Sequence, residues 1–187
     1  MSYYRACLAS LILLVPYCTN AHEENWAPRE GCDLSRPHPG GLYPDAAAEL
    51  ANLGLSARIT QALNTAKKAE NVHGADKTIN GILYTGAVDI SIRCLKGEED
   101  DQIKRILTAL SANGFVAWYR KNGTDGWNGA NHIHAVWVRQ PLKPVLERQV
   151  ESWLAFKNGL KSDKDYTFWK PTDDLLEKIK NYRADAF

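Results

Sequence analysis

The middle of the chain constrains the fold most, because it holds a cluster of predicted strands with short connections. In residues 78–84, Asn80-Gly81 lies between β-forming residues, which is the strongest short-range signal for a hairpin. Further strands are predicted at residues 84–93, 115–120 and 132–138. Because a hairpin and one helix connect them, these strands should form a small, mainly antiparallel sheet.

Amphipathic helices are predicted before, between and after these strands. One follows the acidic run 98–101 and stops at Asn113-Gly114. Acidic side chains at a helix start complement the helix dipole, which favours capping over metal binding for this run. The other predicted helices cover residues 44–53, 56–69 and 144–158, and a last helix is capped by Thr172. The fold class is therefore α+β, with helices covering the sheet.

The first 21 residues have the pattern of a secretory signal peptide. Arg5 supplies a positive charge, residues 6–15 form an apolar run, and a small residue, Ala21, precedes the expected cleavage site. The apolar run is shorter than the ~20 residues that span a bilayer, and no second such run follows. We expect a secreted or periplasmic protein without a membrane span after signal cleavage; the alternative is an uncleaved anchor.

The rest of the chain has the size of one globular domain. Residues 22–43 are rich in proline and glycine and should be extended, whereas residues 44–187 should form a single domain. Because Arg5 is the only charged side chain of the leader, 22 basic residues balance 22 acidic ones outside it. This balance gives no electrostatic reason to expect a nucleic-acid partner. The oligomeric state is left open.

Two cysteines, Cys32 and Cys94, lie outside the leader. In an oxidising compartment an even pair predicts a disulfide, which would attach the N-terminal extension to the core. The alternative is two separate buried thiols.

Two histidines form a His-x-His pattern on a predicted strand. Side chains two residues apart on a strand share one face, so His132 and His134 should point the same way. Both can bind one metal ion, or one can bind it while the other acts as an acid or base. The alternative is a pair of histidines on a half-exposed sheet.

A carboxylate interrupts the predicted strand at residues 84–93. Asp89 lies among apolar and small residues, where a carboxylate is costly unless it is paired or bound to a metal. We expect Asp89 to be a metal ligand; the alternative is a salt bridge to Arg93 or Arg120.

Gly86-Ala87-Val88-Asp89 followed by His132-Ile133-His134 resembles the LAS metallopeptidases, which include the M15 D-alanyl-D-alanine peptidases and share the fold of hedgehog domains. The resemblance covers roughly residues 70–140. It implies that Asp89 and His134 bind Zn²⁺ and that His132 is catalytic. It departs from the family pattern at Thr85, where a glycine is usual, and at Ile82, where the first histidine ligand is usual.

His73 is the nearby histidine that can replace the missing first ligand. A catalytic zinc site normally has three protein ligands, and a hairpin inserted between His73 and Asp89 can fold the histidine back to the metal. The alternative is an ordinary loop histidine. The resemblance also implies a positive or hydrogen-bonding side chain near the oxyanion, for which Arg120, Tyr84 and Arg93 are candidates.

Asp125 lies in the glycine-rich loop that precedes the two histidines. It can act as a base or orient His132, or it can simply form a turn with Gly126. The nearby tryptophans 118, 127 and 137 can form a substrate platform or pack in the core.

The resemblance implies a zinc peptidase that cuts peptide bonds of peptidoglycan stem peptides or cross-links through metal-activated water. One alternative is an inactive LAS-like module that binds zinc or peptidoglycan. Another is a cysteine hydrolase that uses Cys94, which a disulfide would exclude.

Overall fold

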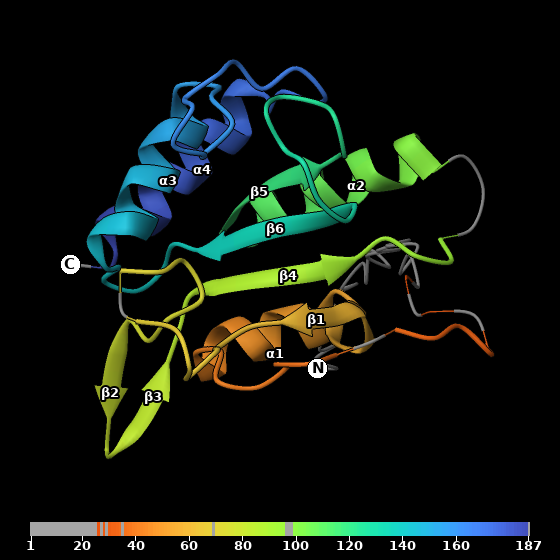
Figure 1. The fold of residues 1–187 in the computed structure, drawn as a ribbon. Coiled ribbons are helices and arrows are strands. Elements are labelled where there is room, and N and C mark those ends of the chain that lie inside the picture. Colours follow the sequence, from red (N-terminus) through yellow and green to blue (C-terminus); the bar gives the residue numbers. More distant parts are fainter. Residues whose placement is uncertain are drawn as a thin grey trace, which may run out of the picture.

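The computed structural model describes residues 26, 28, 30–34, 36–68, 70–95 and 99–186. The fold class is α+β (Figure 1). The helices are α1 (Pro44–Asn52), α2 (Glu99–Ala112), α3 (Pro144–Leu154) and α4 (Asp173–Ala184), with a short 3-10 helix, η1 (Ser56–Arg58). The strands are β1 (Ile59–Gln61), β2 (Lys77–Ile79), β3 (Ile82–Tyr84), β4 (Ala87–Ser91), β5 (Phe115–Arg120) and β6 (His132–Trp137).

The main sheet is antiparallel and has the strand order β1-β4-β6-β5. The central strands β4 and β6 lie beside each other although more than forty residues separate them in sequence (Figure 1). In this register Asp89 lies directly opposite His134, and Ser91 lies opposite His132. The register thus brings a carboxylate and two imidazoles together.

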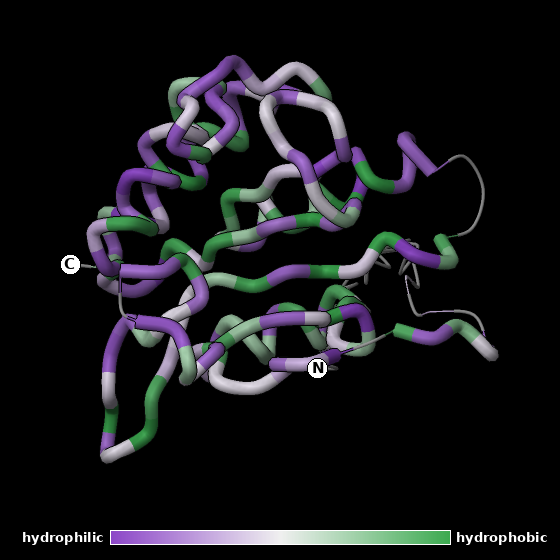
Figure 2. The backbone as a smooth tube through the Cα atoms, in the orientation of Figure 1, coloured by the Kyte–Doolittle hydropathy of each residue, from purple (hydrophilic) through white to green (hydrophobic). Residues whose placement is uncertain are grey.

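Each face of the sheet packs against a different pair of helices. Side chains such as Val88, Ile90 and Ile133 lie in one core cluster with residues of α1 and α2. The alternate residues, including Ala87 and Val136, lie in a second cluster with residues of α3 and α4. Asp89 and His134 share this second face, because alternate residues of a strand point the same way. Figure 2 shows a polar stretch that interrupts the hydrophobic colouring of β4.

The predicted hairpin is confirmed. Strands β2 and β3 pair as a separate two-stranded sheet that extends from the body of the protein (Figure 1). Asn80 and Gly81 have φ angles of 50° and 80°, as a tight type I′ turn requires. The hairpin lies between His73 and Asp89 in the sequence, so its base sets how the histidine approaches the sheet.

The prediction of a helix over residues 56–69 is wrong. Among the described residues of this range, only Ser56–Arg58 is helical, and Ile59–Gln61 form the edge strand β1. This strand is bonded on both sides, since β4 pairs with it on one edge and His38 forms a parallel bridge with Gln61 on the other. These tertiary hydrogen bonds outweigh the helical spacing of the apolar residues. Helix α3 also ends earlier than predicted, at Leu154, whereas Thr172 caps α4 as expected.

The predicted Cys32–Cys94 disulfide is present. It joins the N-terminal segment to the chain just after β4. Arg58 supports the same junction, because its buried guanidinium donates to the carbonyl oxygens of Trp26, Ser91 and Arg93. The predicted signal peptide, residues 1–21, lies outside the described residues. Across the part of the chain that is described, no helix has the length and apolar character needed to cross a membrane.

Candidate metal centre

Neighbouring strands present the polar side chains of the site on one face of the sheet. His134 on β6 lies between Asp89 on β4 and Trp118 on β5. The Trp118 indole stacks on the His134 imidazole with ring centroids 6.0 Å apart. His132 lies two residues further along β6, opposite Arg120. The strand register alone therefore positions all of these residues. A loop contributes the remaining residue of the site, His73.

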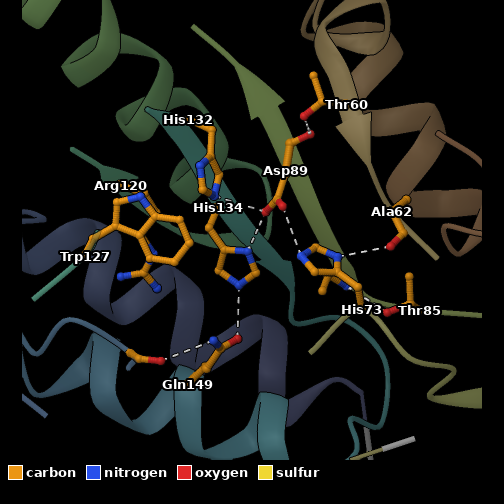
Figure 3. A network of polar contacts seen from close by, with 12 residues as sticks. Thr60, Ala62, His73, Thr85, Asp89, Arg120, Trp127, His132, His134 and Gln149 are labelled. Carbon is orange, nitrogen blue, oxygen red and sulfur yellow. Dashed lines mark hydrogen bonds and ion pairs between the residues drawn. The ribbon is translucent and has the colours of Figure 1, made fainter. Parts of the chain in front are cut away.

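Three imidazoles converge on the Asp89 carboxylate (Figure 3). His134 Nδ1 lies 2.8 Å from Oδ1, and His73 Nε2 lies 3.1 Å from Oδ2. His132 Nε2 is further away, 3.5 Å from Oδ1. The ligand atoms of His73, Asp89 and His134 all lie within 4.8 Å of one another, so this group can hold a metal ion.

The outward nitrogen of each imidazole faces a hydrogen-bond acceptor. His73 Nδ1 lies 3.0 Å from the Ala62 carbonyl oxygen, and His132 Nδ1 lies 2.8 Å from that of Ala130. His134 Nε2 lies 3.1 Å from Gln149 Oε1. An acceptor there favours a proton on the outward nitrogen, so a neutral imidazole in that tautomer directs its lone pair towards Asp89, whereas an imidazolium donates a hydrogen bond to it. A bound cation would satisfy these lone pairs together with the carboxylate.

Several contacts fix the loop that carries His73. The backbone N–H of Asn64 donates to the His73 carbonyl oxygen at 2.8 Å, and the His73 N–H donates to Asn71 Oδ1 at 3.1 Å. The ammonium group of Lys143, just before α3, donates a hydrogen bond to the carbonyl oxygen of Gly74. Because residues 62–64 are not helical, the Ala62 carbonyl is available to His73.

The electrostatics of the site favour a cation. Burial alone would raise the pKa of Asp89, but hydrogen bonds from His134 and His73 outweigh it and hold that pKa well below its usual range. Burial lowers the pKa of His134, although the contact with Asp89 opposes this shift. The carboxylate is therefore ionised at neutral pH and the His134 imidazole tends towards its neutral form, which is the state in which both bind metals.

The geometry suits a small divalent ion with nitrogen and oxygen ligands. Ligands of a tetrahedral zinc ion, at about 2.0–2.1 Å from the metal, lie about 3.3 Å apart. The two closest pairs here, at 2.8 and 3.1 Å, need only a small outward shift. His73 and His134 also each have their second nitrogen within hydrogen-bond distance of an acceptor, as metal-bound histidines almost always do.

Arg120 and His132 lie beside this group. The buried Arg120 guanidinium stands 5.1 Å over the Trp118 ring and donates to the Asn158 carbonyl oxygen. Burial lowers the pKa of Arg120 to about 10, so the side chain stays positively charged at neutral pH. The His132 side chain is 15% exposed, against 5% for His134, and its ring contacts the edge of Trp127. His132 is thus the more accessible imidazole of the pair.

The structure places Asp125 in a different set of contacts. Its carboxylate accepts hydrogen bonds from the hydroxyl and the backbone N–H of Thr167, and its carbonyl accepts one from Asn158. Asp125 has a φ of 49° in the loop between β5 and β6. These bonds anchor the loop to the segment after α3, in line with the turn alternative. Trp118 and Trp137 are buried in the core clusters.

Gln149 is the residue of the site that the sequence analysis missed. It lies on α3 with only 6% of its surface exposed and contacts His134. The signal was available: the buried positions of this helix are Leu146, Gln149, Val150 and Trp153, and Gln149 is the polar residue among them. Gln149 also lines a cleft of about 1200 Å³ between α3 and the loop before His73.

Comparisons with known proteins add no identity to this site. No protein-family model matches the chain, and no curated protein or solved structure matches it.

Proposed function

We propose that the protein is a zinc-dependent peptidase that hydrolyses peptide bonds of peptidoglycan stem peptides or cross-links. The observation that carries the proposal is the convergence of three imidazole nitrogens on the Asp89 carboxylate. Two histidines and one carboxylate form a ligand set of hydrolytic zinc enzymes, in which a fourth position stays open.

When bound by His73, Asp89 and His134, zinc would supply Lewis-acid activation of a water molecule and of the peptide carbonyl. The chain's own residues would do the rest. The Ala130 carbonyl holds the proton on His132 Nδ1, so His132 Nε2 is free to accept a proton beside the centre. The Arg120 charge, which interacts with Asp89, lies where it would stabilise a developing oxyanion.

The resemblance to LAS metallopeptidases supports the substrate class. The resemblance assigns Asp89 and His134 to the family's ligand positions, and these two residues lie opposite each other in the antiparallel sheet. His73 reaches the carboxylate from beyond the β2–β3 hairpin, which supports its role as a substitute for the family histidine replaced by Ile82. We therefore propose a hedgehog/D,D-peptidase-like fold and a location outside the cytoplasm.

An inactive zinc-binding or peptidoglycan-binding module is the second candidate. The observation that favours it is the contact between His132 Nε2 and Asp89 Oδ1 at 3.5 Å. If His132 became a fourth ligand, the coordination would be closed, as in structural zinc sites.

The experiment incubates purified protein with peptidoglycan sacculi, with and without a chelator, and identifies released peptides by mass spectrometry. We expect about one zinc per chain, and peptide release that the chelator abolishes and zinc restores. His134→Ala should lose both zinc and activity, whereas His132→Ala should keep zinc and lose activity. His38→Ala, a histidine outside the site, is the matched control and should keep both.

The outcomes separate the two candidates. If the protein binds zinc but releases no peptide, and if His132→Ala loses the zinc, the closed module is established and the peptidase is excluded. A protein that contains no zinc and gains no stability from it would overturn the peptidase and the zinc-binding module.

A further inference from the structure

We infer that Gln149 is a positioning residue that holds His134 in the tautomer that binds metal, with the proton on Nε2 and the lone pair on Nδ1. The inference rests on the metal centre of the proposed function but does not depend on the reaction. It follows from the contacts of the Gln149 amide at both of its ends.

The orientation of the Gln149 amide is fixed by a second partner. Its Nε2 donates to the Gly159 carbonyl oxygen at 3.2 Å, and a carbonyl can only accept. The amide oxygen must therefore face the other way, 3.1 Å from His134 Nε2 (Figure 3). An oxygen at this place accepts a proton from His134 Nε2, which leaves Nδ1 unprotonated.

The His134 ring has little freedom to avoid this choice. Its side chain is 5% exposed, and the Trp118 indole lies against its face. Gly159, whose carbonyl fixes the Gln149 amide, lies against Trp118, because a Cβ added to Gly159 would stand 2.8 Å from the indole. Gln149, Gly159 and Trp118 thus form one packed support for the imidazole.

Gln149 opposes a competing tautomer that blocks metal binding. With the proton on Nδ1, His134 would donate to Asp89 Oδ1 at 2.8 Å and direct no lone pair to the metal. That tautomer would leave Nε2 and Gln149 Oε1 facing each other as two buried acceptors, which is costly. Removing the amide oxygen removes this cost and shifts the metal-free protein towards the blocked form. Partners of this kind typically change metal affinity by about 10–100-fold.

The test compares Gln149→Leu, which removes both hydrogen bonds at similar volume, with Gln149→Glu, which keeps an oxygen for His134. Nitrogen-15 NMR of the chelated protein at pH about 8, above the ordinary histidine pKa of about 6.5, reports which imidazole nitrogen carries the proton. The His134 signals are assigned by their absence in His134→Gln. Zinc affinity is measured by competition with a chromophoric chelator. Arg148→Leu, an exposed neighbour on α3 that lines the same cleft, is the matched control.

We expect a larger share of the Nδ1–H tautomer in Gln149→Leu than in the parent protein, and zinc affinity lower by 10–100-fold. Gln149→Glu and Arg148→Leu should keep the parent tautomer and an affinity within a few-fold. An unchanged tautomer in Gln149→Leu, or parent zinc affinity in that variant, would overturn the inference, whatever the protein does to peptidoglycan. If Gln149→Leu does not fold, loss of the Nε2–H tautomer in Gln149→Glu would overturn it as well. Conversely, a protein with no peptidase activity could still show the tautomer shift, so the two proposals fail separately.

Discussion

Asp89 carries a negative charge at a point where the imidazoles around it direct lone pairs rather than N–H groups. The carbonyls of Ala62 and Ala130 and the amide of Gln149 each occupy the outward nitrogen of one ring. Without a cation, the imidazoles must either take up further protons or leave the carboxylate and the facing nitrogens as acceptors in contact, and both states cost free energy. The metal-free protein should therefore be less stable than the same fold with its charge neutralised.

Asp89→Asn tests this argument. The amide has nearly the same shape but can donate to one facing nitrogen, and it removes a buried charge. We expect the chelated variant to be at least as stable as the chelated parent in thermal unfolding. Zinc at about 100 times its Kd should stabilise the parent by about 2.7 kcal/mol and leave the variant nearly unchanged. A chelated variant that melts well below the parent would mean that imidazolium groups already compensate the carboxylate.

Sequence reasoning reached the site residues unevenly. Alternation along a strand predicted that His132 and His134 share a face of their strand, and it assigned Asp89 to one face of its own strand. The register that sets Asp89 opposite His134 depends instead on tertiary pairing. His73 was reached through the ligand pattern of a family, because no local signal leads from residue 73 to the sheet. Asp125 was a candidate by loop position alone, and loop position does not determine which neighbour its carboxylate meets.

At the scale of elements, regular patterns predicted structure where local and tertiary preferences agree. The Asn80-Gly81 hairpin, the strand at Phe115–Arg120 and the Thr172 cap all follow from short-range chemistry. Residues 59–61 show the opposite case, since their hydrogen bonds come from β4 and His38, which are distant in sequence. No local propensity reports such partners.

The base of the β2–β3 hairpin depends on a buried ion pair. Lys143 Nζ lies 2.9 Å from Asp76 Oδ1, and the two side chains are 8% and 1% exposed. Asp76 also accepts a hydrogen bond from the Gly86 N–H at 2.6 Å. Burial raises the pKa of Asp76 more than Lys143 and Gly86 lower it, so the charge is costly to keep there. The pair connects the His73–Gly74 loop to the start of α3 and to β4.

Lys143→Met should lower the free energy of unfolding by about 3–5 kcal/mol, because it leaves the Asp76 charge buried without a partner. Asp76→Asn keeps an acceptor for Gly86, so the double variant should lose less stability than the sum of the two single variants. Urea denaturation of the four proteins measures this coupling. Lys104→Met, which breaks an exposed pair with Asp101, is the control and should change stability by less than about 1 kcal/mol. Additive single effects would show that Asp76 does not need Lys143.

At the scale of the whole molecule, the two faces of one sheet differ in polarity. One face is covered by α1 and α2 around a continuous apolar core, and the other is covered by α3 and α4, with Gln149 of α3 in contact with His134. The polar residues of β4, β5 and β6 continue that second face towards the metal centre. The N-terminal segment and the disulfide lie at the end of β4 beyond Ser91, outside the set of residues that contact Asp89.

Loss of the disulfide should therefore lower stability without removing the metal centre. Cys32 and Cys94 are 62 residues apart, and closing a loop of that length stabilises a fold by about 4 kcal/mol through the entropy of the unfolded chain. Part of the junction remains without the bridge, since Arg58 still donates to the Trp26, Ser91 and Arg93 carbonyls. The double variant Cys32→Ala/Cys94→Ala should unfold at lower urea concentration and still bind zinc with parent affinity at temperatures where it is folded.

Two measurements on the same double variant decide the point. Urea denaturation with chelator gives the loss of stability, and zinc titration by calorimetry gives affinity and stoichiometry. If the double variant is as stable as the parent protein, Arg58 and Trp26 hold the segment alone and the disulfide contributes nothing to the free energy of unfolding. Lower zinc affinity in the folded variant would contradict the prediction. It would mean that loosening the N-terminal segment at the end of β4 also moves Asp89 and His134.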